Sequence, residues 1–274
     1  MKIQKTTGRN PLPGNLIERR KNERQTTRSD LLPPRSRQER KEEVKEYPKI
    51  QSVFKRETEG PHKGKFIEGK WALPEFEYLR DCEWEGTEKI DGTNIRVQWT
   101  CFGTGQPEPF VNFQGKTDNA QIPPFLLDKL KEMFPKEKLQ SVFPDTDVCL
   151  YGEGYGARIQ KGGGNYIPDG VSFVLFDVWI GGWWLLRPSV VDIAMKLHIT
   201  FVPLVCTLPL LEAITMVRDS TLLSGWSRPG EKLAFPMEGL VLKPPVELFS
   251  RNGHRIITKV KTKDFYKGGK DGGK

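Results

Sequence analysis

The sequence predicts a fold of the α+β class, in which antiparallel sheets are flanked by helices. Several segments either alternate apolar and polar residues or are apolar throughout, as strands are. Between them lie stretches whose apolar residues have helical spacing. These strands and helices do not follow the strict βαβ alternation that is typical of a parallel sheet, which favours the α+β class.

The predicted elements follow one another along most of the chain. The first clear strand is expected at residues 94–99, where apolar and polar residues alternate. Residues 124–139 have helical spacing until Pro135 interrupts the pattern, and a shorter helix is expected at 190–198. The other predicted strands span residues 147–156, 171–180, 237–243 and 254–261.

The composition divides the chain into three parts. Residues 1–50 hold 14 Lys or Arg and 7 Asp or Glu, so they carry +7 of the formal net charge of +8. Their polar runs contain too few apolar residues to offset the entropy of ordering, so we expect a basic, largely disordered arm. A solvated tail without function is the alternative. Residues 51–266 have the composition of a globular domain, and residues 267–274 are expected to form a flexible Gly/Lys tail.

The overall charge and the cysteines narrow the class of protein. A pI near 9.2 favours a polyanionic partner, because clustered cations release counterions from phosphates. The four cysteines are far apart and the three histidines are isolated, which argues against a structural zinc site or a disulfide framework. We expect a reducing, cytoplasmic location (the host cytoplasm if the chain is phage- or virus-encoded), with no signal peptide and no membrane span.

Lys89 is the first candidate for chemistry. It stands between Glu88 and a tight turn that contains Gly92, directly before a predicted strand. An ordinary surface lysine is one interpretation. The other is a nucleophile that attacks phosphorus, which requires neighbouring cations or burial to lower a lysine pKa from its usual value of about 10.4.

Three further lysines could supply such cations. Lys259 and Lys261 are two residues apart in a predicted strand, so their side chains share one face, and Lys243 lies in another predicted strand. On a solvent-exposed face they would form an ordinary charged edge. Opposite a nucleoside triphosphate they would bind phosphate oxygens and disfavour protonation of a lysine among them.

Three acids, Glu153, Asp177 and Glu238, could balance these cations. Asp177 lies inside an apolar strand, where an unpaired carboxylate is costly. It therefore has either a buried partner or a role in orienting waters bound to Mg²⁺ (or Mn²⁺). The neighbouring Phe176 is either a core residue or a flat surface for a purine ring.

Together these segments resemble, in order, the motifs of the covalent nucleotidyltransferase superfamily, which comprises ATP-dependent ligases and RNA capping enzymes. The resemblance runs from about residue 71 to 266 and is greatest to the phage-type RNA ligases. EKIDGTN resembles the nucleophile motif, FQGKTDNAQIP the next element and LYGEGYGARIQKGGGNY the ribose-binding motif. FVLFDVW resembles the base-stacking strand, MEGLVLKPP the fourth motif and ITKVKTKDF the last. The implied fold is a nucleotidyltransferase (ATP-grasp-like) domain.

One position separates the subfamilies. DNA ligases and capping enzymes usually have arginine five residues after the nucleophilic lysine, whereas Asn94 stands here, as in RNA ligases. The resemblance implies that Lys89 attacks the α-phosphorus of ATP and that Asn94 is one of the nucleotide-binding residues. It further implies Glu88 near the adenine edge, Phe176 stacked on the base, Glu153 on the ribose hydroxyls, Lys243, Lys259 and Lys261 on the phosphates, and Asp177 and Glu238 on magnesium-bound waters.

The resemblance also implies the substrate. AMP would pass from Lys89 to an RNA 5′-phosphate, and attack by a 3′-OH would seal the strand, with a nicked duplex among the candidate substrates. Lys116 stands where the family often has an arginine that contacts the phosphate of the nucleic acid, so charge is kept and bidentate geometry is lost. Many relatives have a further domain after the last motif, whereas this sequence continues for only about a dozen residues beyond it. We therefore expect RNA to be bound by the catalytic domain, the basic arm or another protein.

Two alternatives stay open. An ATP-dependent DNA ligase or an RNA capping guanylyltransferase would use the same covalent chemistry. A catalytically silent RNA-binding module that has kept the fold belongs to a different class.

Overall fold

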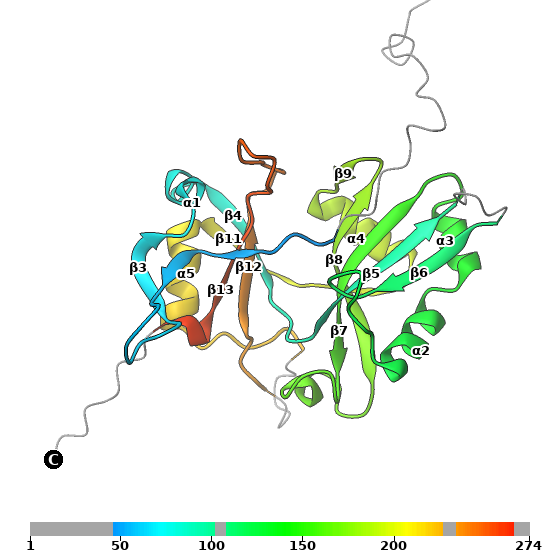
Figure 1. Cartoon of the computed structure of the whole chain (residues 1–274), viewed down its shortest axis with the longest axis horizontal. Coiled ribbons are helices and arrows are strands. Elements are labelled where there is room, and N and C mark those ends of the chain that lie inside the picture. Colours follow the sequence, from blue (N-terminus) through cyan, green and yellow to red (C-terminus); the bar gives the residue numbers. More distant parts are fainter. Residues whose placement is uncertain (1–45, 102–107, 227–233, 266–274) are drawn as a thin grey trace, which may run out of the picture. The chain divides into compact units, whose positions relative to one another are not determined.

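Two β-sheets carry most of the structure (Figure 1). The computed structural model describes residues 46–101, 108–226 and 234–265. The five-stranded sheet contains, from edge to edge, β1 (Gln51–Ser52), β13 (Thr258–Lys261), β12 (Gly239–Lys243), β4 (Glu83–Glu88) and β11 (Leu204–Pro209). The six-stranded sheet contains β10 (Thr200–Phe201), β8 (Val171–Ile180), β7 (Val148–Gly156), β5 (Thr93–Thr100) and β6 (Phe110–Gln114), with β9 (Trp183–Trp184) paired to β8. A small sheet pairs β2 (Phe54–Arg56) with β3 (Phe66–Trp71).

The sheets are mixed, so the prediction of antiparallel sheets is correct for most pairs and wrong at two edges. β1 runs parallel to β13, and β10 runs parallel to β8. A parallel neighbour needs a crossover connection and not a hairpin. The chain provides one between β8 and β10 in helix α4 (Arg187–Lys196).

The helices pack on the sheets, and a proline separates two of them. α2 (Pro124–Met133) and α3 (Lys136–Val142) are separated at Pro135, as predicted. The other helices in the described ranges are α1 (Pro74–Tyr78) and α5 (Leu210–Asp219), together with the short 3₁₀ turns η4 (Gly163–Asn165) and η5 (Thr262–Asp264). None of the helices in the three described ranges is long and apolar enough to cross a membrane.

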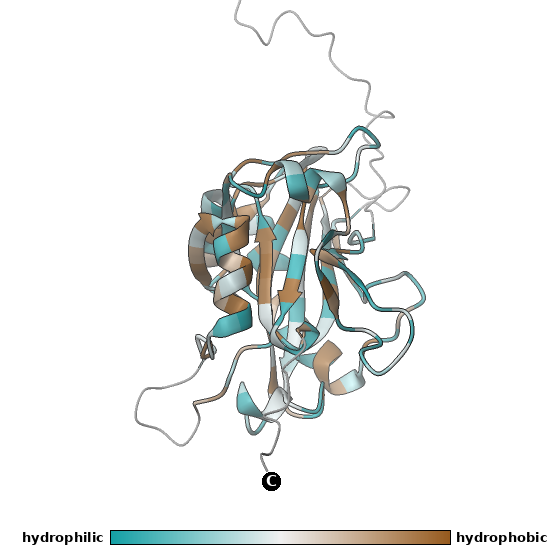
Figure 2. Cartoon of the chain, turned by 90° about the vertical axis from the view of Figure 1, so that its left-hand side faces the viewer, coloured by the Kyte–Doolittle hydropathy of each residue, from teal (hydrophilic) through white to brown (hydrophobic). Residues whose placement is uncertain are grey.

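Each sheet has its own hydrophobic core. The six-stranded sheet packs against α2, α3 and α4, and the predicted apolar face of β5, Ile95, Val97 and Trp99, is fully buried there. The five-stranded sheet packs against α5 and the small sheet. Hydrophobic and hydrophilic residues alternate along the ribbons on that side of the molecule (Figure 2). All described residues belong to one compact unit.

The basic arm was predicted to end at residue 50, and this end is placed too late in the sequence. Residues 1–45 and the predicted tail at 267–274 lie outside the described residues. Residues 46–50, which we assigned to the arm, pack into the fold, and Tyr47 is only 6% exposed. A cluster with Cys149 and Tyr151 gives Tyr47 the apolar contacts that the composition of the arm did not reveal.

The buried and the exposed face of α2 should differ in their effect on stability. Leu130 of α2 is fully buried, whereas its neighbour Lys131 is exposed. Leu130→Ala should lower the free energy of unfolding by about 2–5 kcal/mol, because it removes apolar contacts and leaves a cavity. Lys131→Ala should change it by less than about 0.5 kcal/mol. Denaturant titration measures both, and equal effects would contradict the assigned helix face.

Candidate functional site

Three segments that pass between the two sheets line one cavity of about 350 Å³. Residues 47–50 lead into β1, residues 89–92 connect β4 to β5, and residues 202–203 connect β10 to β11 (Figure 1). A volume of this size is in the usual range for small-ligand sites. The cavity therefore lies where the chain changes sheets.

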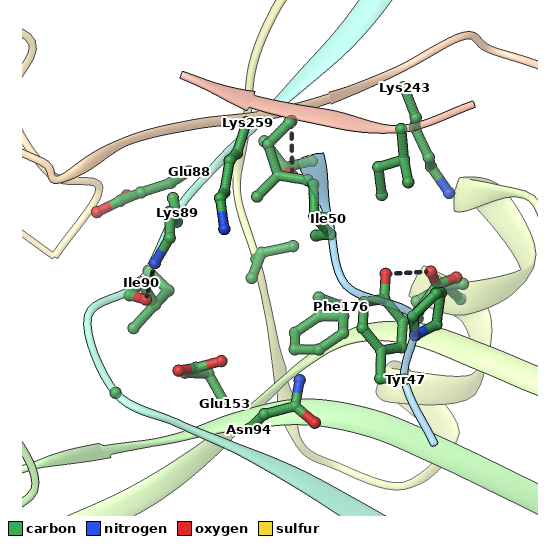
Figure 3. A pocket seen from close by; sticks show the side chains of 18 of the residues that line it. Tyr47, Ile50, Glu88, Lys89, Ile90, Asn94, Glu153, Phe176, Lys243 and Lys259 are labelled. Carbon is green, nitrogen blue, oxygen red and sulfur yellow. Dashed lines mark hydrogen bonds between the residues drawn. The ribbon is translucent and has the colours of Figure 1, made fainter. Parts of the chain in front are cut away.

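Most of the predicted site residues meet in this cavity. Those that line it are Glu88, Lys89, Asn94, Lys116, Glu153, Phe176, Asp177, Lys243 and Lys259. The remaining two, Glu238 and Lys261, are joined to it through Lys89. Figure 3 shows the amines of Lys89 and Lys259 pointing into the same space, with Glu153 and Asn94 across from them.

The carboxylate of Glu238 connects two of the lysines. Its Oε2 is 2.5 Å from the Nζ of Lys89, and its Oε1 is 2.5 Å from the Nζ of Lys261. Burial acts to raise the pKa of Glu238, but these ion pairs outweigh burial and lower it below its usual range. Glu238 is therefore an anion held between two amines.

The turn after Lys89 depends on Gly92. A Cβ at this position would lie 2.3 Å from the backbone oxygen of Gly154, so only glycine fits. β5 begins at the next residue and pairs with β7, which sets Asn94 opposite Glu153. The turn thus brings Lys89, at the end of one sheet, next to Glu153 of the other.

Glu153 is a carboxyl group whose charged form is disfavoured. Burial raises its pKa to about 8, the nearby Lys89 acts to lower it, and Glu238 and Asp91 add to the increase. Near neutral pH the group is largely protonated, so it can donate as well as accept a hydrogen bond.

Lys259 lies among other cations. Its pKa is lowered by burial and by the charges of Lys261, Lys89, Lys116 and Arg56. Because like charges at close range repel, such a cluster favours an anionic ligand.

Asp177 has the buried partner that our structural interpretation required. Its Oδ2 accepts a hydrogen bond from the Oη of Tyr47 at 3.0 Å and pairs with the Nη1 of Arg255 at 2.5 Å. Arg255 also binds Glu247, which pairs with Lys243 at 3.2 Å. Two of the predicted site residues, Asp177 and Lys243, are therefore linked through a network of fixed charges.

No pattern in the sequence marks Tyr47, Glu247 or Arg255 as members of this network. An aspartate inside an apolar strand indicates that a partner exists, but nothing in the sequence says which distant cation provides it. Tyr47 also contacts Phe176, with ring centroids 5.0 Å apart and an interplanar angle of 69°. Figure 3 shows Phe176 between Tyr47 and the open space of the cavity.

Among the described residues that line the cavity, three buried acceptors have no hydrogen-bond partner: Oε1 of Glu88, Oδ1 of Asn94 and Oδ1 of Asp177. Glu88 accepts a hydrogen bond from the backbone N–H of Gly225 through its other oxygen, at 2.7 Å. Burial raises the pKa of Glu88, although hydrogen bonds from Ser224 and Gly225 oppose this. Its carboxylate lies on the side of Lys89 away from Phe176 (Figure 3).

These features fit a nucleotide. An aromatic ring borders the cavity, several cations converge in it, and unpartnered acceptors are available for donors of a ligand. Within the described residues, no group of three or more His, Cys, Asp or Glu could hold a metal ion by itself. Magnesium, however, is commonly held by one or two carboxylates together with substrate phosphates.

Comparison with known proteins gives a family and a set of similar folds. The family model described as RNA ligase matches residues 82–261. One mutant of the Naegleria gruberi RNA ligase, solved with ATP and Mn, matches with a TM-score of 0.53 and 18% identity, over 79% of this chain and 57% of that chain. Another mutant with ATP and Mn, and the same ligase with PPi, each match with a TM-score of 0.51 and 19% identity, over 79% of this chain and 62% of that chain.

At this identity the structural matches establish the fold alone. The chain spans about three fifths of the length of these solved chains. No protein with a curated description matches the sequence significantly.

We predict that Tyr47 stabilises the fold through both its ring and its hydroxyl. Tyr47→Ala should lower the free energy of unfolding by about 3–5 kcal/mol, because a buried ring is lost. Tyr47→Phe keeps the ring and removes the hydrogen bond to Asp177, so it should cost about 1–3 kcal/mol. Tyr78→Ala is the control, because Tyr78 is 86% exposed and should have little effect. If all three variants unfold at the same denaturant concentration, Tyr47 is not packed.

We also predict that Glu153 makes stability depend on pH. Between its usual pKa of 4.5 and its folded value of about 8, the folded protein holds a proton that the unfolded chain has lost. The free energy of unfolding therefore decreases as the pH rises through this window, on the order of 2 kcal/mol for a partly exposed group. Glu153→Gln lacks this component, so its Tm relative to wild type should rise between pH 5 and pH 8. A Tm difference independent of pH would contradict the prediction.

Proposed function

Because the chain belongs to the RNA ligase family, we propose that it is an ATP-dependent RNA ligase. It joins RNA 3′-OH and 5′-phosphate ends through lysyl-AMP and RNA-adenylate intermediates. The observation that carries this proposal is that Lys89, Glu153 and Lys259, from three separate segments, face one cavity of nucleotide size. A nucleotidyltransferase domain covering residues 51–266, extended to residue 46, performs the reaction.

In the first step, the Nζ of Lys89 attacks the α-phosphorus of ATP. The Lys89 ammonium first gives one proton to solvent, because only the neutral amine has an electron pair for the attack. A P–N bond then forms, the bond from the α-phosphorus to the bridging oxygen breaks, pyrophosphate leaves with the electron pair of that bond, and the nitrogen releases a second proton to solvent. Lys259 and Lys261 stabilise the negative charge that develops on the phosphates. Since Glu238 pairs with Lys89, that ion pair has to open before the attack.

Other cavity residues hold the nucleotide. Phe176 offers a face to the base, and Glu153, largely protonated near neutral pH, donates a hydrogen bond to a ribose hydroxyl. The unpartnered acceptors of Glu88 and Asn94 accept from nucleotide donors. Lys243 contacts the nucleotide phosphates, and Lys116, on the exposed loop after β6, contacts the phosphate of the RNA.

A divalent cation, Mg²⁺ or Mn²⁺, accompanies ATP in this proposal. Glu238 is the best-placed carboxylate to orient its waters, because it lies beside both Lys89 and Lys261. Asp177 is engaged with Tyr47 and Arg255, so it serves the site by fixing the wall behind Phe176, and one of its oxygens remains without a partner. The cation supplies charge neutralisation on the phosphates.

In the later steps, the P–N bond breaks as an RNA 5′-phosphate oxygen takes the AMP, and the RNA 3′-OH then displaces AMP from the activated end. The protein's contribution is to position groups and to neutralise charge. We place this reaction in the cytoplasm.

Self-adenylylation tests the first step. After incubation with ATP and magnesium, the intact mass should increase by one AMP, and Lys89→Ala should abolish the increase because it removes the nucleophile. Lys70→Ala, an exposed lysine on β3 outside the cavity, is the matched control and should label as wild type does.

Two outcomes would overturn the assignment. Labelling by GTP alone would indicate a guanylyltransferase, and unchanged labelling of Lys89→Ala would exclude Lys89 as the nucleophile. A chase of the labelled protein with 5′-phosphorylated RNA and with nicked DNA then distinguishes an RNA ligase from a DNA ligase.

A further inference from the structure

A second cavity, of about 560 Å³, adjoins the nucleotide cavity. The two cavities share Ile50 and Lys259 in their linings. Asp264 is the single acid among the described residues that line the second cavity. The basic residues that line it are Lys49, Lys55, Arg56, Lys259, Lys261 and Lys263.

Ion pairs with other described residues neutralise only part of this positive charge. Both carboxylate oxygens of Asp264 are taken by Arg56, at 2.9 and 2.6 Å. Lys261 shares Glu238 with Lys89, and Lys263 is 4.0 Å from the same carboxylate with 72% of its side chain exposed. The two carboxylates, Asp264 and Glu238, therefore carry fewer negative charges than the basic residues of this cavity carry positive ones.

The fold holds these cations together against their repulsion. β1 pairs with β13 so that Ser52 lies beside Lys259, which brings residues 49–56 next to the last strand. The Nζ of Lys65 binds the backbone oxygen of Lys263 at 2.6 Å, and Arg56 is fixed to Asp264 by two hydrogen bonds. A cluster of like charges that the backbone enforces is stabilised when an anion binds.

We propose that this second cavity binds the phosphate backbone of the RNA substrate and holds it next to the adenylylated lysine. The inference rests on the proposed function and adds a binding site to it. Backbone phosphates fix the position of a nucleic acid on a protein without reading its sequence, which suits an enzyme that must hold RNA ends.

The distribution of the cations favours RNA over the phosphates of ATP. Lys49 and Lys55 of residues 49–56 and Lys263 after β13 are exposed, so the charge continues outward from Lys259 over the surface. A polymer with a phosphate at every nucleotide can contact such a series of amines. ATP is already provided for in the first cavity, which contains Lys89, Glu153 and Phe176.

The test replaces two exposed cations that lie outside the nucleotide cavity. In Lys55→Ala/Lys263→Ala, binding of a 5′-phosphorylated RNA oligonucleotide, measured by fluorescence anisotropy, should weaken about tenfold at low salt. The slope of log K against log salt should become shallower by about 1.4, or about 0.7 for each lost phosphate contact with a single strand. Transfer of AMP from the labelled protein to RNA should slow in parallel, whereas formation of lysyl-AMP, which involves no RNA, should keep its wild-type rate.

The matched control is Lys131→Ala/Lys196→Ala, which removes two exposed lysines from α2 and α4. If RNA affinity falls equally in both double variants, the second cavity is not the RNA site. If formation of lysyl-AMP falls together with RNA binding, the cavity serves the ATP phosphates and the proposal is overturned. RNA binding needs no catalysis, so it decides this proposal even if the wild-type protein forms no lysyl-AMP, a result that would overturn only the proposed function.

Discussion

The connection from Lys89 to Gly92 is the constraint on which the rest of the site depends. β4 belongs to the five-stranded sheet and β5 to the six-stranded sheet, and only the four residues 89–92 connect them. They can do so because Gly92 has no side chain to collide with the backbone of Gly154. As a result, an amine from the five-stranded sheet faces a carboxyl group from the six-stranded sheet, and the cavity between them receives residues from both.

Three carboxyl groups around this cavity differ in state because their surroundings differ. Glu238 is an anion between two amines, and its pKa is lowered. Burial keeps Glu153 largely protonated near neutral pH. Asp177 is locked to Arg255 and Tyr47. One kind of functional group, the carboxyl, thus provides a counter-ion, a hydrogen-bond donor and a structural anchor, and the fold determines which role each one has.

The long strands could be predicted from the sequence because they depend on local patterns, and the resemblance to family motifs pointed to nine residues that line the cavity. Alternation identified β5, an apolar run identified β8, and a series of motifs identified residues that converge on one cavity. The two-residue strands β1 and β10 could not be predicted, since pairing with a distant strand is their only signal. The same limit applies to Tyr47 and Arg255, whose importance comes from a partner far away in the sequence.

The short stretch from Tyr47 to Ile50 has an engineering consequence. Tyr47 packs in the aromatic cluster behind Phe176. β1, which follows this stretch, pairs with β13, the strand that carries Lys259. A shortened version of the chain that starts after Ile50 would lose Tyr47, Pro48 and Ile50 from the lining of the cavity. An expressed fragment therefore has to begin upstream of Tyr47 if the cavity is to keep all of its walls.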